Sequence, residues 1–392
     1  MFRARGGRLR VMSFLSLRIG VVLCLAMICG AARGEAGNDL PPELAVAFAP
    51  PLELAGEFGS YRSPLIFNDG SRVTKAEEWP RRREEILQAW HGIMGAWPAL
   101  LEKPRLELLE KTDRGDFEQR RIEVETAPGV MAKGYLLVPR SGGPKFPAVL
   151  VPFYEPETSV GLGKPLRDFG AQLARRGFVV LAIGSPGGDA RLPALGEAKC
   201  QPLSYLAYVA ANCANALANL PEVDAKRIGV VGHSYGGKWA MFASCLYERF
   251  ACAAWSDPGI VFDEQRPNVN YWDPWYLGAE NGPPRPVGLP DENHPRTGAY
   301  KVLRERGMDL HELHALMAPR PFLVSGGAED QQARWTALNH AIAVNRLLGY
   351  ENRVAMTNRV GHEPTEESNA QLCRFFEHFL GKPIVQGSAG AQ

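Results

Sequence analysis

The sequence lacks several features that mark whole classes of protein. It has no excess of one charge, with 44 Lys and Arg against 43 Asp and Glu, and acidic residues flank its basic triplet at 81–83. This balance argues against nucleic acid as a partner. Only seven cysteines occur among 392 residues, their spacings match no zinc pattern, and no internal repeat is present. The remaining composition, 45% hydrophobic and 22% charged, is globular and excludes wholesale disorder, collagen and a coiled-coil rod.

Residues 1–34 differ from the rest of the chain. Several arginines precede an apolar stretch at 19–28, and small residues follow at 30–32. This order predicts a secretory signal peptide, so we expect a secreted or periplasmic protein. The apolar stretch is shorter than the ~20 residues that span a bilayer, which argues against a stable membrane anchor. Each cysteine of this segment follows a bulky residue, which argues against lipid attachment.

Cleavage after residue 34 changes both the charge and the cysteine count. It removes six arginines and no acidic residue, which leaves a net charge of about −5. Five cysteines remain, an odd number, so at least one is a free thiol unless the protein pairs with another chain. We expect buried free thiols at these positions, which are Cys200, Cys213, Cys245, Cys252 and Cys373.

Residues 35–104 are predicted to form an N-terminal extension of loop and helix. Thr74 and Glu77 have the spacing of an N-cap and its capping-box acid, so a helix is expected at 75–91. Pro80 lies one turn into that helix, where proline is costly, and this favours a later start.

Two kinds of strand follow within residues 105–382. Three β-type segments separated by turn signals predict antiparallel strands that lead into a sheet, at 105–111, 117–126 and 131–138. Short apolar strands then alternate with helical segments, which predicts a mostly parallel sheet with helices on both faces. These strands are expected at 148–151, 178–183, 227–231, 251–255, 322–324 and 353–356.

A long insert, residues 258–318, interrupts this alternation. It is rich in proline and glycine and carries an aromatic cluster, so we interpret it as a lid-like insert. Trp272 and Trp275 of this cluster are candidate substrate-binding residues because tryptophan suits the apolar faces of sugar rings. Packing within the lid is the alternative role. Residues 383–392 are expected to form a flexible tail.

The strongest chemical signal is the segment VVGHSYGG at 230–237, which follows an apolar strand and leads into a helix-forming run. In this context Gly-x-Ser-x-Gly predicts a nucleophile elbow, in which a serine sits on a tight turn flanked by small residues. Ser234 is therefore the predicted nucleophile. The helix N-terminus places the backbone N–H of Tyr235 where it can stabilise an oxyanion.

A serine nucleophile needs a base that follows it in the order Ser, acid, His. His362 comes after the last predicted strand and before the closing helix, and it is the predicted base. His340 is expected inside a helix, and His378 lies in the last helix, so both are placed less well.

Two regions offer an acid that could orient the imidazole. Asp330 follows a predicted strand through a short loop and is the preferred acid, while Asp257 and Asp263 after the preceding strand are alternatives. The second oxyanion donor is expected in the loop after the first parallel strand. Phe153 or Tyr154 would supply its backbone N–H there.

His311 and His314 have a spacing that could place both on one helix face and so invites a metal interpretation. No third ligand has recognisable spacing, and both precede a core strand, where histidines more often make structural hydrogen bonds. We therefore predict no metal site.

The elbow and its partners resemble the α/β-hydrolase superfamily over about residues 130–382. More narrowly, the chain is similar to secreted bacterial carbohydrate esterases, above all glucuronoyl esterases and their acetyl-xylan-esterase-like neighbours. This similarity is carried by NDG through EW at 68–79, RRREEI at 81–86, GHSYGGK at 232–238, and His311 followed by APRP at 318–321. Tyr235 stands where glucuronoyl esterases have an arginine that assists the oxyanion. The resemblance implies an α/β-hydrolase domain over residues 105–382.

These observations together predict an exported serine esterase that works through an acyl-enzyme, with no metal or organic cofactor. Carbohydrate esters are the favoured substrates because aromatic side chains in an acidic exported protein suit sugar rings. A serine peptidase of prolyl-oligopeptidase type is one alternative, although that type usually carries a large propeller, and fewer than 100 mature residues precede the leading strands. A non-catalytic binding protein on a hydrolase scaffold is the other. The sequence gives no oligomeric state.

Overall fold

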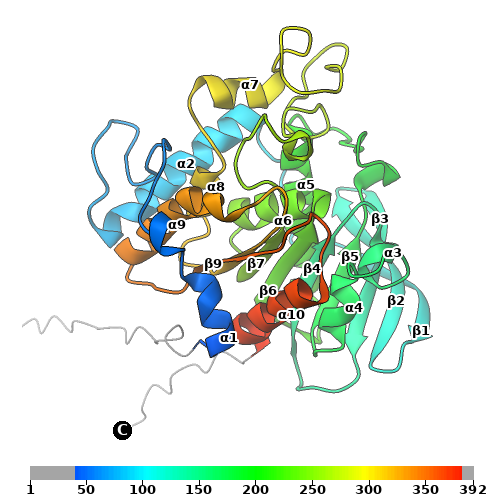
Figure 1. Ribbon diagram of the computed structural model, residues 1–392. Coiled ribbons are helices and arrows are strands. Elements are labelled where there is room, and N and C mark those ends of the chain that lie inside the picture. The colour runs from blue at the N-terminus through cyan, green and yellow to red at the C-terminus, as the bar shows by residue number, and fades with distance from the viewer. Residues whose placement is uncertain (1–39, 382–392) are drawn as a thin grey trace, which may run out of the picture. The chain divides into compact units, whose positions relative to one another are not determined.

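The sheet of this protein contains nine strands in the order β1-β2-β3-β5-β4-β6-β7-β8-β9 (Figure 1). The computed structural model describes residues 40–381, so the predicted signal peptide at 1–34 and tail at 383–392 lie outside the described residues. In this spatial order, β1, β2, β3 and β5 pair antiparallel with one another. From β5 through β4 to β9, every pair of neighbours is parallel. The strands are β1 Leu106–Asp113, β2 Phe117–Ala127, β3 Val130–Pro139, β4 Phe146–Pro152, β5 Val179–Ile183, β6 Val223–His233, β7 Cys252–Ser256, β8 Phe322–Gly326 and β9 Val354–Asn358. The predicted mostly parallel sheet with leading antiparallel strands is confirmed.

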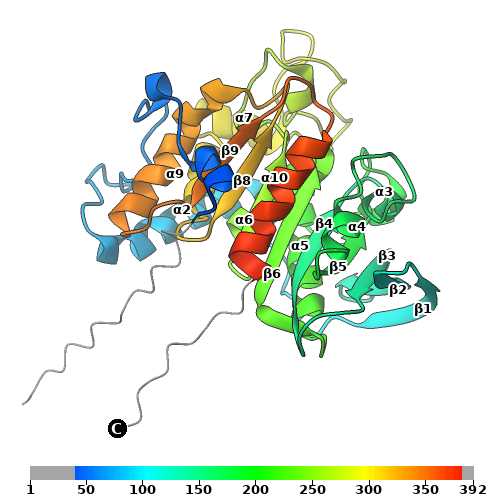
Figure 2. The same ribbon diagram turned by 60° about the horizontal axis from the view of Figure 1, so that its bottom comes forward.

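Helices cover both faces of this sheet. They are α1 Pro42–Ala45, α2 Trp79–Met94, α3 Pro156–Ser159, α4 Phe169–Ala174, α5 Pro202–Ala218, α6 Tyr235–Leu246, α7 Gly298–Glu305, α8 His311–Ala315, α9 Trp335–Leu347 and α10 Glu366–Phe376, and a π-helical turn follows at Glu377–Gly381. Residues of α2, α5, α6, α8 and α9 share one hydrophobic core, whereas those of α4 and α10 belong to a second. Figure 2 shows α10 on one face of the sheet with α5 and α6 behind it.

The two cores explain why the parallel strands are apolar throughout. In β4, Ala148 and Leu150 belong to the first core, and Val149 and Val151 belong to the second. Successive side chains of a strand point to opposite faces, so a sheet covered on both sides requires apolar residues at every position. The carboxyl ends of the same strands carry the chain into loops at one edge, where the site described below is built.

The first long helix begins later than the sequence predicted. A 3-10 turn at Ala76–Glu78 precedes α2, so Pro80 occupies the second position of the α-helix, where its missing N–H costs nothing. The capping carboxylate is that of Glu78, whose Oε2 accepts the N–H groups of Thr74 at 2.8 Å and Lys75 at 3.0 Å. The predicted capping acid, Glu77, was therefore one residue too early.

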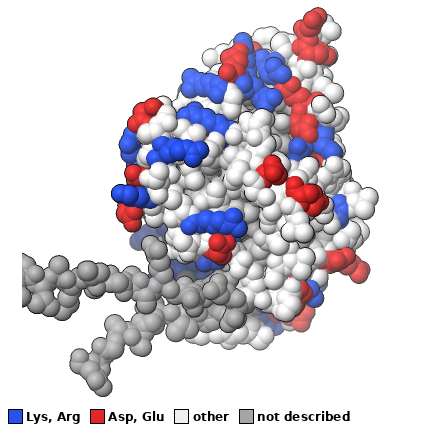
Figure 3. Space-filling model, turned by 60° about the vertical axis from the view of Figure 1, so that its left-hand side comes forward, with Lys and Arg blue, Asp and Glu red and all other residues white. Residues whose placement is uncertain are grey.

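The surface and the cysteines add two observations. The face drawn in Figure 3 carries basic and acidic side chains close together, with uncharged surface between them. Cys200, Cys213, Cys245, Cys252 and Cys373 are all free thiols and all buried, as predicted. Within residues 40–381 no helix has the length and apolar character needed to cross a membrane.

Candidate active site

Ser234 lies at the junction of β6 and α6, in a backbone conformation that the local glycines make possible. Its φ is +55°, and its N–H donates to the Ser256 carbonyl at 2.8 Å. A Cβ at Gly232 would lie 2.0 Å from the Gly236 oxygen, and a Cβ at Gly236 would lie 2.2 Å from the Pro152 oxygen. No side chain fits at either position, so the tight turn depends on both glycines.

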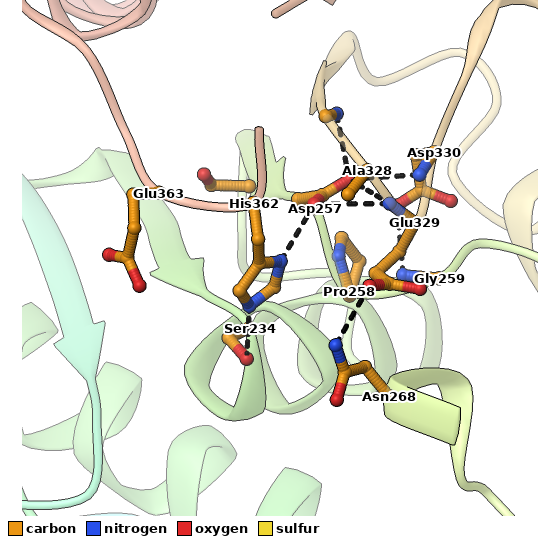
Figure 4. Close-up of polar contacts among 12 residues, drawn as sticks. Ser234, Asp257, Pro258, Gly259, Asn268, Ala328, Glu329, Asp330, His362 and Glu363 are labelled. Carbon is orange, nitrogen blue, oxygen red and sulfur yellow. Dashed lines mark hydrogen bonds and ion pairs between the residues drawn. The ribbon is translucent and has the colours of Figure 1, made fainter. Parts of the chain in front are cut away.

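A chain of two hydrogen bonds leads from Ser234 to a carboxylate (Figure 4). His362 Nε2 lies 2.9 Å from Ser234 Oγ, and His362 Nδ1 lies 2.7 Å from Asp257 Oδ2. His362 is in the loop between β9 and α10, and Asp257 directly follows β7. The geometry is that of a nucleophile, a base and the acid that orients the base.

Asp257 is fully buried and is held from the opposite side by backbone amides. Its Oδ1 accepts the N–H groups of Gly327 at 2.7 Å, Glu329 at 3.1 Å and Asp330 at 2.8 Å. A buried carboxylate is costly unless such donors satisfy it. The loop after β8 therefore supplies the environment of the carboxylate, and the loop after β7 supplies the carboxylate itself.

The prediction that Asp330 orients His362 is wrong. The Asp330 carboxylate accepts the N–H groups of Gly259 at 2.8 Å and Ile260 at 2.6 Å, and Figure 4 shows it beyond Asp257 from His362. Burial, together with the neighbouring Asp257, raises the pKa of Asp330 to about 6. Asp263, the other alternative, instead pairs with Arg334 at 2.6 Å.

The oxyanion donors divide differently from the prediction. Tyr235 opens α6, so its N–H is one of the amides that lack an i−4 carbonyl within the helix and can receive an oxyanion. The N–H of Phe153 donates to the Ile183 carbonyl at 3.1 Å, which corrects its assignment as a donor. Tyr154 stays at the site, with its ring stacked on that of Tyr235 at 4.7 Å. Partial burial raises the pKa of Tyr154, so its phenol keeps its proton.

Two hollows meet at Ser234 and His362. One is a cavity of about 220 Å³, lined by Tyr154, Ala190, Arg191, Ser234, Tyr235, Lys238, Asn268, Asn270, Trp275, Tyr276 and His362. The other, of about 470 Å³, is lined by Phe153, Tyr154, Glu155, Lys164, Arg167, Ser234 and His362. Ser234 and His362 line both hollows, so groups on the two sides of a reacting carbonyl have separate space.

Lys238 in the first cavity was not predicted as a site residue, although it ends the elbow motif. Its Nζ donates to the Asn268 carbonyl at 2.9 Å and lies over the rings of Tyr271 and Tyr276, 5.1 Å and 5.5 Å from their centroids. Burial lowers the pKa of Lys238 to about 8, against the opposing effect of Asp330 and other nearby acids. The sequence signal that could have identified Lys238 was its position four residues after Ser234, about one helical turn along α6.

The two tryptophans of the insert have different surroundings. Trp275 is partly buried and lines the first cavity, with the guanidinium of Arg191 5.7 Å from its ring centroid. Trp272 is 1% exposed, belongs to the hydrophobic core and is absent from the cavity wall. Its ring packs 6.0 Å from that of Tyr300 in α7. The prediction that Trp272 binds substrate is therefore wrong.

The histidines of α8 pack inside the protein, His311 against the N-terminal extension and His314 against the sheet. His311 Nε2 lies 2.7 Å from the Arg62 carbonyl, and His314 is completely buried beside Trp255. Burial lowers the pKa of His311 to about 4, so this imidazole is neutral at pH 7. Among residues 40–381, no group of three or more His, Cys, Asp or Glu side chains is arranged to hold a metal ion.

Comparisons with known proteins agree with the fold and define the class. Residues 168–382, more than half of the chain, match the prolyl oligopeptidase family. The protein is thus a serine hydrolase on the α/β-hydrolase fold. The chain belongs to the prolyl oligopeptidase family. A search among curated protein sequences gave no significant match.

Several solved structures have a similar fold at low sequence identity. A glucuronoyl esterase from Solibacter usitatus is 20% identical with a TM-score of 0.64, covering 82% of this chain and 98% of its own. A carbohydrate esterase family 15 glucuronoyl esterase from Caldicellulosiruptor kristjansonii is 21% identical with a TM-score of 0.58, covering 86% and 94%. A candidate acetyl xylan esterase from Bacteroides fragilis is 17% identical with a TM-score of 0.51, covering 81% and 80%. The resemblance predicted from the motifs is confirmed.

Proposed function

We propose that this protein hydrolyses carboxylic esters of carbohydrates, with Ser234 as nucleophile, His362 as general base and Asp257 as the orienting acid. The observation that carries the proposal is the pair of hydrogen bonds, 2.9 Å and 2.7 Å, that joins these three side chains where two hollows meet. Such a chain activates an otherwise weak serine nucleophile.

The reaction follows from this geometry. His362 Nε2 accepts the proton of Ser234 Oγ as the oxygen attacks the ester carbonyl, and Asp257 stabilises the imidazolium that forms. We assign the developing oxyanion to the backbone N–H of Tyr235, in the first turn of α6, and to the predicted backbone N–H of Tyr154 in the loop after β4. His362 then returns the proton to the leaving alcohol. A water molecule, deprotonated by the same imidazole, then attacks the acyl carbon. The bond to Ser234 Oγ breaks, this oxygen regains the proton from His362, and the acid is released.

The carbohydrate preference rests on the lining of the first cavity. Asn268, Asn270 and the Lys238 ammonium offer polar groups to hydroxyls, and the Trp275 ring offers an apolar face. The solved structures with this fold include glucuronoyl esterases, one of them described as a carbohydrate esterase. Tyr235, whose phenol lies 2.9 Å from Ser185 Oγ, stands where the resemblance to glucuronoyl esterases implies an arginine, so the acyl group is to be assigned by experiment.

Export through the predicted signal peptide completes the proposal. The arginines, the apolar stretch and the small residues within residues 1–34 support a secreted or periplasmic location. Expression of the full chain in a bacterial host, with the mature N-terminus read by Edman degradation or mass spectrometry, tests this point. Cleavage near residue 34 is expected, and recovery of the uncleaved chain in the cytoplasm would contradict export.

Membership of the prolyl oligopeptidase family favours peptidase activity as the second candidate function. Hydrolysis of p-nitrophenyl acetate compared with that of a peptide p-nitroanilide separates the two activities. We expect the ester to be cleaved and the amide to resist.

A panel of acetyl, feruloyl and glucuronoyl esters then identifies the acyl group. Labelling by a fluorophosphonate separates an enzyme from a binding protein, and absence of both labelling and hydrolysis would end the proposal.

The role of Trp275 in substrate binding gives a prediction for KM. If this ring contacts a sugar, Trp275→Ala should raise the KM for a carbohydrate ester by about 2- to 10-fold, because such aromatic contacts contribute roughly 0.5–1.5 kcal/mol. The kcat/KM for p-nitrophenyl acetate should barely change, since its small acyl group does not extend along the cavity. Steady-state kinetics on both substrates measure the difference.

Trp272→Ala is the matched control, because this tryptophan is buried in the same insert without lining the cavity. It should lower the melting temperature and affect both substrates alike, since large-to-small core changes cost roughly 3–5 kcal/mol. Equal loss on both substrates for Trp275→Ala would remove the sugar-stacking role of this ring.

A further inference from the structure

Arg359 lies three residues before His362, and its side chain turns back onto the loop that carries this histidine. Nη2 donates to the His362 carbonyl at 2.6 Å, and Nε donates to the Glu363 carbonyl at 2.8 Å. The backbone N–H of Arg359 donates to the Gly326 carbonyl at 3.0 Å, which continues the pairing of β9 with β8. One guanidinium therefore closes the His362 loop on itself.

The same guanidinium reaches the ends of two neighbouring strands. Nη1 donates to the Ser325 carbonyl at 2.7 Å and to Ser325 Oγ at 3.1 Å, both at the end of β8. Nη2 also lies 3.2 Å from Ser256 Oγ at the end of β7. Three loops that meet at the site are thereby connected through one side chain.

Ser256 connects Arg359 to Ser234 and Asp257. It directly precedes Asp257, and its carbonyl accepts the N–H of Ser234 at 2.8 Å. Its Oγ also lies 3.1 Å from Nδ1 of His233, the residue before Ser234. A displacement of Ser256 would therefore move both the nucleophile and the acid relative to His362.

The guanidinium of Arg359 donates to neutral oxygens instead of pairing with a carboxylate. Among residues 40–381, no carboxylate lies within ion-pair distance of its guanidinium, although the side chain is partly buried. Burial lowers the pKa of Arg359, with Asp257 and Asp330 acting in the opposite direction. Arginine presents five N–H donors in a planar fork, and here they donate to carbonyl and hydroxyl oxygens of separate loops.

We propose that Arg359 is a positioning residue, which fixes the His362 loop relative to Ser234 and Asp257 through its bonds to Ser256, Ser325 and the His362 carbonyl. The inference rests on the proposed function, because it assigns His362 the role of base. Arg359 lines neither of the two hollows, so its loss should affect the rate of the chemical step and not substrate binding.

The test compares Arg359→Met and Arg359→Lys with a matched control, Arg320→Met. Arg320 is also partly buried and donates only to backbone carbonyls, those of Ser244, Tyr247, Phe250 and Leu316. The first three lie after the middle of α6 and before β7, at the ends of these elements remote from Ser234 and Asp257. Arg359→Met should lower kcat on p-nitrophenyl acetate about 10²-fold with KM nearly unchanged, since a displacement of about 1 Å from the productive geometry costs that much. Arg359→Lys should recover part of this loss. Arg320→Met should lower the melting temperature while the folded enzyme keeps its kcat.

Chemical rescue gives a readout that a purely structural role would not move. Millimolar guanidinium should restore part of the kcat of Arg359→Ala and none of that of Arg320→Ala. A wild-type kcat in folded Arg359→Met, or in folded Arg359→Lys if the methionine variant does not fold, would overturn the inference. Parallel losses of kcat and melting temperature in the Arg359 and Arg320 variants would do the same.

Failure of the proposed function can be told apart from failure of this inference. The rate of Ser234 labelling by a fluorophosphonate depends on the activated serine and not on the ester chosen. Wild-type protein that is labelled but cleaves no ester would contradict the esterase proposal. Slower labelling in Arg359→Met than in Arg320→Met would still support the positioning role, and equal labelling rates would refute it.

Discussion

Ser234→Ala is expected to reduce kcat for ester hydrolysis by 10⁴-fold or more, because removal of a triad member leaves only binding and the oxyanion donors to assist the reaction. Ser234 Oγ is the atom that lies 2.9 Å from His362 Nε2, and alanine has no oxygen to replace it. The measurement is the initial rate on p-nitrophenyl acetate at substrate saturation. Fluorophosphonate labelling should disappear at the same time.

The fold should survive this change. Alanine keeps the backbone N–H that donates to Ser256, and the two flanking glycines that allow the tight turn are untouched. The melting temperature of the variant therefore serves as the control. Retention of more than a tenth of the wild-type activity in purified Ser234→Ala would assign the nucleophile elsewhere.

The sequence allowed prediction of the elbow because several local signals coincide there. Residues 230–237 combine an apolar strand, two glycines around a serine and a helix-forming run, and the structure has β6 and α6 on either side of Ser234. His362 was predicted by the same logic, since the fold places a base in the loop after the last strand, and the structure has its Nε2 2.9 Å from Ser234 Oγ. Both predictions rest on patterns among residues that are close together in the chain, and a single sequence shows such patterns.

The position of the acid required information that the sequence does not carry. Asp257 follows β7 with no intervening residue, whereas Asp330 follows β8 after three intervening residues, and both loops begin at the same edge of the sheet. Which carboxylate faces the imidazole depends on the path of the two loops, including the φ of +50° at Asp257. That path brings the amides of the second loop onto the first carboxylate, which no spacing rule predicts.

The aromatic residues of the insert show a related limit. Trp272 and Trp275 are three residues apart in a segment without periodicity, so their burial could not be predicted from the pattern. The structure buries Trp272 in the core beside Tyr300 and leaves Trp275 at the cavity. The backbone amide of Phe153 was misassigned for a similar reason, because its bond to Ile183 belongs to the sheet.

Asp257→Asn is expected to lower kcat on the order of 10⁴-fold, by analogy with loss of the orienting aspartate in serine proteases. The carboxylate accepts a hydrogen bond from the Nδ1–H of His362 across 2.7 Å, so it fixes the tautomer whose Nε2 can accept the Ser234 proton. An asparagine amide placed there can donate to Nδ1 and so favours the tautomer that cannot act as base. The loss should appear in kcat, with little change in KM.

Asp330→Asn is the matched substitution, in the same buried cluster but without contact to the imidazole. Its carboxylate accepts two backbone amides, from Gly259 and Ile260, and an asparagine can accept only with its oxygen. Loss of one such bond from a buried donor costs about 1–3 kcal/mol, so the melting temperature should fall while kcat stays within about tenfold of wild type. If Asp330→Asn instead shows the larger loss of kcat and Asp257→Asn the smaller, the acid in the working enzyme is Asp330. The loops after β7 and β8 would then have to exchange roles during catalysis.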